Sequence, residues 1–111
     1  MVTPLSRGKS FEYRVLYILK EYFPDAKRVP VSGSASGFKG DIITDKFVIE
    51  CKKTMHESIR IKKEWLKSIE KIAREQGKHP LLVFSLRNTE PYAVLPLREF
   101  LRMCRKVKAS R

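Results

Sequence analysis

Two acids and a lysine lie near the ends of the stretch GDIITDKFVIECKK, which runs from Gly40 to Lys53. Asp41 is close to its start, and Glu50 and Lys52 are close to its end. Apolar residues lie on both sides of a short polar segment, a pattern that predicts two antiparallel strands joined by a tight turn. Such a hairpin would bring its two ends, and the acids on them, to one place.

The register of this hairpin decides whether the acids meet. We expect a turn centred on residues 45–46, an Asp-Lys pair, although the Gly that favours tight hairpins is missing. Asp41 then falls opposite Glu50, with their Cβ atoms about 5 Å apart. Because side chains alternate along a strand, Lys52 shares the face of Glu50. Cys51 points the other way, and its backbone carbonyl stays near the acids.

Two carboxylates opposed across a ladder repel each other unless a cation lies between them. Mg²⁺ prefers hard oxygen ligands and often takes one or two carboxylates together with water and phosphate oxygens. Asp41, Glu50 and the carbonyl of Cys51 therefore form a candidate magnesium site. Lys52 beside it could orient or help deprotonate an attacking water. The alternative is that both acids are solvated hairpin residues with Lys52 as their ion-pair partner.

A large positive charge accompanies the hairpin. The 111 residues include 24 Lys plus Arg against 12 Asp plus Glu, for a net charge of +12. A polyanion is the expected partner, and nucleic acid is the commonest one. No apolar run is long enough to cross a membrane, and the first ten residues lack an apolar signal core, so we expect an intracellular protein without membrane contact. The length suits one domain, residues 1–111.

Hydrophobic spacing predicts the elements that position these residues. One helix is expected from Ser6 to about Tyr22, and a second from about Ile61 to Glu75. The other expected elements are an edge strand in KRVPVSG, the two hairpin strands, the strands PLLVFSL and YAVLP, and a short final helix from Leu97 to Cys104 with a frayed basic tail. The order α-β-β-β-α-β-β-α predicts an α/β fold.

Two further features could contribute to the same chemistry. Glu12 lies beside the apolar stripe of the first helix as an unpaired acid and could point toward the hairpin, or could interact with the helix N-terminus instead. The segment SGSASGFKG has little side-chain bulk, so a ligand could approach its backbone closely. Its Ser32, Ser34, Lys39 and backbone amides could meet a DNA phosphate.

Together these pieces resemble the archaeal-type Holliday junction resolvases, a family within the PD-(D/E)xK nuclease superfamily. The resemblance rests on RGKSFEYRVLYILK, RVPVSGSASGFKGDI, VIECKKT and YAVLP, in that order. It implies a restriction-endonuclease-like core, a five-stranded mixed sheet flanked by helices, and a symmetric homodimer. It also implies Mg²⁺-dependent cutting of four-way DNA junctions, in recombination and repair, with Mn²⁺ able to substitute.

The resemblance assigns roles to particular residues. Asp41 and Glu50 would bind the metal with the carbonyl of Cys51, Lys52 would be the catalytic lysine, and Glu12 would be a helix-borne acid that could also reach the metal. Gly40 stands in place of the proline that gives the superfamily its name, and only the acid after it acts. The expected DNA contacts are Arg7, Lys9, Arg28, Ser32, Ser34, Lys39 and Lys53.

Other interpretations stay open at this point. The chain could be a restriction-like or repair nuclease of the same superfamily, or a nucleic-acid-binding protein without catalysis. It could act in a cell's own cytoplasm or nucleoid, or be encoded by a virus and act inside the host cell. The strand PLLVFSL and the helix that carries Trp65 offer apolar surface for a dimer, and packing in the core is the alternative for both.

Overall fold

A computed structural model describes the backbone of residues 4–29 and 40–109 and the side chains of residues 10–29 and 40–105. The elements within these ranges, in chain order, are α1 (Pro4–Lys20), β1 (Lys27–Arg28), β2 (Ile42–Ile43), β3 (Phe47–Lys53), α2 (Lys63–Glu75), β4 (His79–Ser85), β5 (Tyr92–Val94) and α3 (Leu97–Ala109). This is the predicted order, and the α/β fold class is confirmed.

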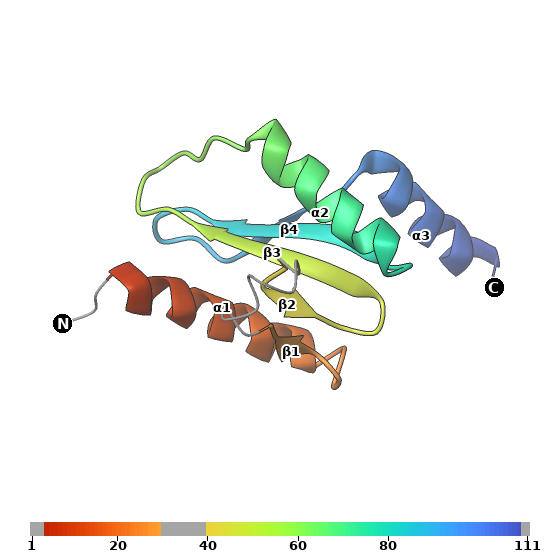
Figure 1. The fold of residues 1–111 in the computed structure, drawn as a ribbon, viewed down its shortest axis with the longest axis horizontal. Coiled ribbons are helices and arrows are strands. Elements are labelled where there is room, and N and C mark those ends of the chain that lie inside the picture. Colours follow the sequence, from red (N-terminus) through yellow and green to blue (C-terminus); the bar gives the residue numbers. More distant parts are fainter. Residues whose placement is uncertain (1–3, 30–39, 110–111) are drawn as a thin grey trace.

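One mixed sheet forms the centre of the molecule. Within the described residues it has five strands in the order β1-β2-β3-β4-β5. The long strands β3 and β4 are parallel and joined through α2, and the other neighbouring pairs are antiparallel. Helix α1 lies on one side of the sheet and α2 on the other (Figure 1). This arrangement matches the expected core of a five-stranded sheet flanked by helices.

The alternation of side chains along β3 divides the core between the two faces. Ile49 packs in the larger cluster with Phe11 and Val15 of α1. Val48 packs in the smaller cluster with Ile69 and Ala73 of α2. Adjacent apolar residues therefore anchor helices on opposite faces, as the period of two requires. Glu50 and Lys52 follow Val48 on the α2 side, whereas Cys51 packs against the α1 cluster.

The hairpin forms in the predicted register. Ile42 pairs with Ile49 and Ile43 with Val48. The turn forms without glycine because the side chain of Thr44, which is 2% exposed, accepts hydrogen bonds from the backbone of the turn. Its Oγ1 accepts the backbone N–H groups of residues 46 and 47 at 3.0 and 2.9 Å. Both turn residues keep negative φ angles, so no left-handed backbone is needed.

Three boundaries of α1 and α2 differ from the prediction. Helix α1 begins at Pro4 and not at Ser6, which agrees with the preference for proline in the first helical turn. It ends at Lys20, and two apolar residues of the segment predicted to be helical, Ile18 and Tyr22, are exposed by 44% and 75%. Helix α2 begins at Lys63 and not at Ile61.

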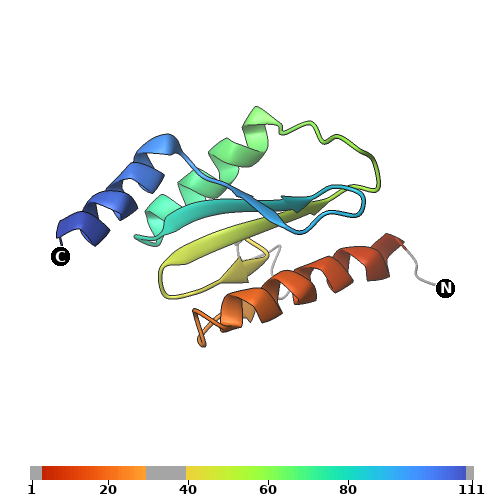
Figure 2. The ribbon, with the colours of Figure 1, turned by 180° about the vertical axis from the view of Figure 1, so that it is seen from behind.

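Helix α3 continues past Cys104 to Ala109, so the predicted frayed tail is wrong for those residues. Its sequence contains no proline or glycine that would end the helix at Cys104. Seen from behind in Figure 2, α3 lies beyond the end of the sheet. Glu99 anchors its first turns, because Oε2 lies 2.5 Å from Nδ1 of His79 in β4.

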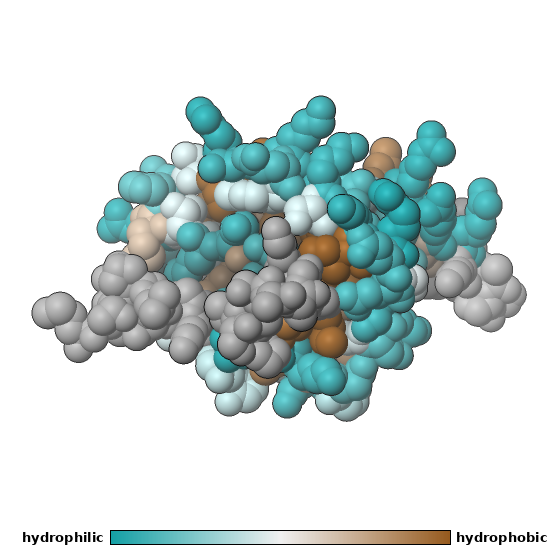
Figure 3. All heavy atoms as spheres, viewed as in Figure 1, coloured by the Kyte–Doolittle hydropathy of each residue, from teal (hydrophilic) through white to brown (hydrophobic). Residues whose placement is uncertain are grey.

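The surface agrees with the composition. On the face shown in Figure 3 hydrophilic residues predominate, and apolar residues are visible between them near the middle of the molecule. Within the described ranges no helix is long and apolar enough to span a membrane.

Candidate active site

Strand β3 places Glu50 and Lys52 side by side. Lys52 Nζ lies 3.4 Å from Glu50 Oε2, and both side chains are half-buried. The contact follows from the strand period, which puts residues two apart on one face. The predicted juxtaposition of this acid and amine is therefore present.

Asp41 lies at the end of the hairpin ladder. The strand pairing stops at Ile42, so Asp41 is not paired with Glu50 in the ladder as expected. Its backbone N–H instead donates to the carbonyl of Ile49 at 2.8 Å, and its Oδ2 accepts the N–H of Cys51 at 2.7 Å. The side chain thus replaces a main-chain carbonyl as the next acceptor along β3, which holds this carboxylate against the strand that carries Glu50.

The two acids are electrostatically coupled. Burial raises the pKa of Asp41, and the hydrogen bond from Cys51 opposes the rise. Burial raises the pKa of Glu50 to about 7, and the negative charge of Asp41 adds to the effect. Partial desolvation and mutual repulsion thus disfavour two charges in this place, and a bound cation would relieve both costs.

Glu12 reaches the same edge of the sheet from α1. Its negative charge contributes to the raised pKa values of Asp41 and Glu50. The expectation of an unpaired acid is wrong, because Glu12 Oε1 accepts hydrogen bonds from Nε and Nη2 of Arg28 at 3.1 and 3.0 Å. Arg28 also donates from Nη1 to the hydroxyl of Tyr13 at 3.1 Å and lies 4.5 Å from that ring's centre. Sequence spacing alone gave no sign of this pairing across 16 positions.

Trp65 forms the other wall beside Lys52. The Nζ atom of Lys52 lies 4.5 Å from the centre of the Trp65 ring, and Nζ of Lys62 lies 5.7 Å from it. The indole is half-buried near the start of α2. Sequence reasoning treated Trp65 only as core or dimer surface. The predicted strand-helix-strand order could have indicated its contact with Lys52. A helix that connects two parallel neighbouring strands packs on one face of the sheet, and in this chain that face carries Lys52.

One comparison with known proteins found a match. A family model described as "Phage putative PDDEXK endonuclease" matches residues 5–110. The chain belongs to this family. No curated protein and no solved structure matches it. Membership in this PD-(D/E)xK endonuclease family supports an endonuclease whose substrate is DNA, and nucleases of this superfamily are typically metal-dependent. An acid followed after a gap by Glu-x-Lys occurs in this chain at Asp41, Glu50 and Lys52.

The donor set fits the metal dependence that is typical of the superfamily. Within the residues described here, no group of three or more His, Cys, Asp or Glu side chains is arranged to hold a metal ion. Asp41, Glu50 and the carbonyl of Cys51 offer two carboxylates and one neutral oxygen. Mg²⁺ commonly binds through one or two carboxylates and retains several waters, so a smaller protein ligand set suits it.

The expected DNA contacts are only partly described. Arg28 is engaged by Glu12 and Tyr13, and Lys53 is exposed at the end of β3. Arg7 and Lys9 lie in α1, where the structure describes only their backbone. Ser32, Ser34 and Lys39 lie outside the described residues.

Proposed function

We propose that this endonuclease is a Mg²⁺-dependent enzyme that cuts four-way DNA junctions. The observation that carries the proposal is the coupling of Asp41 and Glu50 at the hairpin end, with Lys52 in contact with Glu50. The resemblance to junction resolvases adds the substrate. The net charge of +12 supports binding through the DNA backbone, which suits recognition of shape over sequence.

The roles follow from the chemistry of each group. Asp41 and Glu50, with the carbonyl of Cys51, would hold Mg²⁺, which when bound supplies charge neutralisation at the phosphate. Lys52 is held between Glu50 and the ring of Trp65, so its ammonium group is positioned to orient a water or a phosphate oxygen. Glu12 holds Arg28 at the same edge, where a guanidinium group can face a second phosphate oxygen.

The reaction is hydrolysis of a phosphodiester. Water attacks phosphorus in line with the bond to the 3′ oxygen, and that bond breaks. The water loses a proton, the departing 3′ oxygen gains one, and the products are a 5′ phosphate and a 3′ hydroxyl. Lys52 orients the water here, and solvent takes up the proton that the water loses and supplies the one that the 3′ oxygen gains.

A homodimer would place two such sites on two opposed strands of a junction. The segment PLLVFSL packs in the core, which was the alternative to a dimer surface, because β4 lies inside the sheet and its Leu82 and Val83 are buried. Helix α3 offers the apolar surface instead. Its Leu97, Phe100 and Leu101 are exposed by 70%, 50% and 52%, at a spacing that puts them on one helix face. We assign this face to the second copy.

A panel of synthetic DNA substrates tests the activity. Wild type should nick a four-way junction symmetrically in Mg²⁺ and leave linear duplex of the same sequence intact. Glu50→Ala and Lys52→Ala should lose at least about a hundredfold in cleavage rate and still bind the junction in Ca²⁺. Equal cleavage of linear duplex would sink junction specificity and favour a restriction-like or repair nuclease. Full activity in both variants would favour a binding protein without this catalytic site.

A further inference from the structure

A row of side chains crosses three strands beside Lys52. Lys52 of β3 pairs with Phe84 of β4, and Phe84 pairs with Tyr92 of β5. Directly paired residues of neighbouring strands project from the same face of a sheet. This face is the α2 side, because Lys52 contacts the Trp65 ring there. Two aromatic rings thus continue the line that begins at the proposed catalytic lysine.

The rings are stacked, and the outer one is open to solvent. The centroids of Phe84 and Tyr92 lie 5.9 Å apart, with an angle of 26° between the ring planes. Phe84 is half-buried, whereas Tyr92 is 49% exposed. Strand β5 ends the sheet, so within the described chain no further strand lies beyond Tyr92. One face of its ring is therefore supported by Phe84, and the space beyond its outer face is not filled by the sheet.

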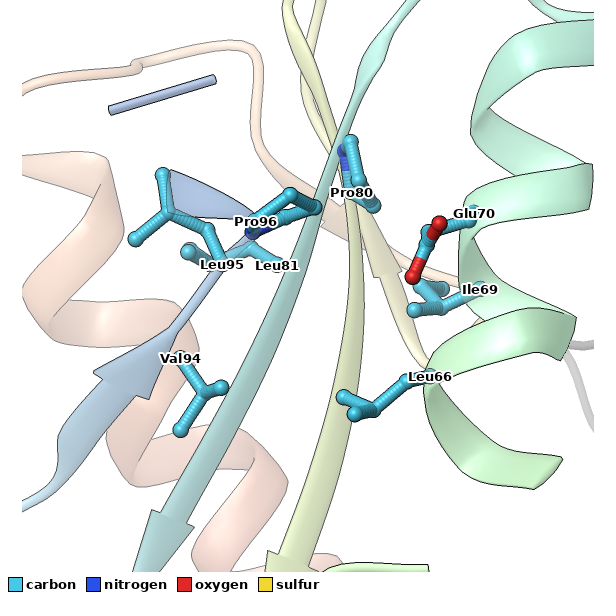
Figure 4. A pocket seen from close by; sticks show the side chains of 8 residues that line it. All are labelled: Leu66, Ile69, Glu70, Pro80, Leu81, Val94, Leu95 and Pro96. Carbon is cyan, nitrogen blue, oxygen red and sulfur yellow. The ribbon is translucent and has the colours of Figure 1, made fainter. Parts of the chain in front are cut away.

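The position of α2 explains why these rings stay open. Helix α2 covers the opposite end of the same sheet face, where its Leu66 and Ile69 face Pro80 and Val94 across a small pocket of about 100 Å³ (Figure 4). The carboxyl ends of β3 and β4 extend beyond the start of α2 (Figure 1). Phe84 lies near the carboxyl end of β4, beyond the start of α2, and Tyr92 beside it keeps about half of its surface exposed.

The surroundings favour nucleic acid over an apolar partner. Lys52, Lys53 and Lys62 lie at the same end of β3 and α2. Tyr92 is two strand spacings from Lys52, which is about 10 Å, a reach suited to a nucleotide adjoining the phosphate at Lys52. A base inside a duplex is stacked on its neighbours and cannot present its ring face, whereas an unpaired base at a branch point can.

We propose that the stacked pair Phe84 and Tyr92 binds one unpaired base next to the scissile phosphate, with the outer face of Tyr92 in contact with the base. The inference rests on the proposed nuclease function and narrows its substrate to DNA with an unstacked nucleotide beside the cut. The base would become the third ring of a stack whose first two rings, Phe84 and Tyr92, are already in place without DNA. Selection of branched DNA then comes from base stacking in addition to backbone shape.

A binding experiment without cleavage tests this site. The probes are a four-way junction with 2-aminopurine beside the branch point and a fully paired duplex with the same label, both in Ca²⁺. Wild type should quench the junction probe. Tyr92→Leu should lose the quenching and bind the junction roughly 5- to 100-fold more weakly, with duplex affinity unchanged. Tyr92→Phe keeps the ring and should behave as wild type.

Tyr22→Leu is the matched control, because Tyr22 is 75% exposed and lies outside the proposed site. Circular dichroism confirms that each variant is folded before binding is measured. Junction affinity unchanged in Tyr92→Leu, or affinity for junction and duplex reduced alike, overturns the stacking site. If the protein quenches the junction probe and binds the junction selectively but never cleaves DNA in Mg²⁺, the stacking site is supported and the proposed nuclease function is contradicted. The experiment therefore separates failure of the stacking site from failure of the nuclease function.

Discussion

At the residue scale, Glu50 is placed where its charge is costly to the folded protein. It is half-buried, close enough to Asp41 for that charge to raise its pKa, and only partly compensated by Lys52. A residue selected for stability alone would be neutral here. The same arrangement attracts a divalent cation, so the energetic cost of the metal-free state and the proposed metal affinity have one origin.

Glu50→Gln should therefore stabilise the metal-free protein while abolishing cleavage. The pKa of Glu50 rises from its ordinary value of 4.5 to about 7 on folding, so the folded chain holds this proton more tightly than the unfolded chain. Stability is then lost as the pH rises from about 4.5 through about 7, and the loss is complete above that range. Glutamine has no charge to desolvate, so the melting temperature in EDTA should exceed that of wild type by several degrees at pH 8.

The same comparison at pH 5 provides an internal control, because Glu50 of the folded wild type then holds its proton and the two melting temperatures should lie close together. Glu57→Gln removes an exposed acid and should change neither value. A wild type as stable as Glu50→Gln at pH 8 would contradict the proposed charge conflict.

At the element scale, the hairpin of β2 and β3 sets the position of the acids. Strand β2 has two residues, and a slip of one residue would turn every side chain of the pair to the other face. Two features hold the register. Thr44 closes the turn from inside, and Asp25 Oδ2 accepts the N–H of Asp45 from outside at 2.6 Å. The positions of Asp41 and Glu50 at the open end of the hairpin thus depend on hydrogen bonds at its turn.

Thr44→Val should expose this dependence. Valine matches threonine in shape but leaves the N–H groups of residues 46 and 47 without the acceptor Oγ1. The free energy of unfolding should fall by about 1–3 kcal/mol, as is usual when a polar group loses its partner in a buried place. Urea unfolding measures the change. Thr44→Ser retains the hydroxyl and should lose less, so a serine variant less stable than the valine variant would contradict the role of Oγ1.

At the scale of the whole molecule, the two C-terminal helices meet the sheet differently. Helix α2 covers part of one sheet face, whereas the amphipathic helix α3 contacts the rest of the molecule mainly through its first turns. Single exposed apolar residues are ordinary on protein surfaces, whereas a helix with a continuous exposed apolar face marks an interaction site. On α3 the residues at 97, 100 and 101 form such a face. A second copy related by a two-fold axis would cover it.

Leu101→Glu should convert the dimer into a monomer. The carboxylate would replace apolar contact area in the middle of the assigned interface and would have to be desolvated there. Light scattering after size exclusion should give about twice the 13.0 kDa chain mass for wild type and the single chain mass for the variant. Arg102→Gln lowers the charge by the same amount at an exposed position on another side of α3 and serves as control. A monomeric wild type would overturn the dimer.

The sequence by itself determined the order of the elements, the register of the hairpin and the shared face of Glu50 and Lys52. These features follow from the period of a strand and the spacing of apolar residues, which act over a few positions of the chain. The end of the ladder at Ile42 was missed, because a side-chain acceptor such as Asp41 can replace a main-chain one without changing the pattern.

The tertiary structure alone decided what lies around this centre. It paired Glu12 with Arg28, placed Trp65 against Lys52, and left Tyr92 stacked and open at the sheet edge. These contacts join residues far apart in the chain, and they depend on how each helix lies across the sheet and where it ends. Such distances and angles are set by the packing of side chains on both faces of β3, and no local pattern in one sequence encodes them.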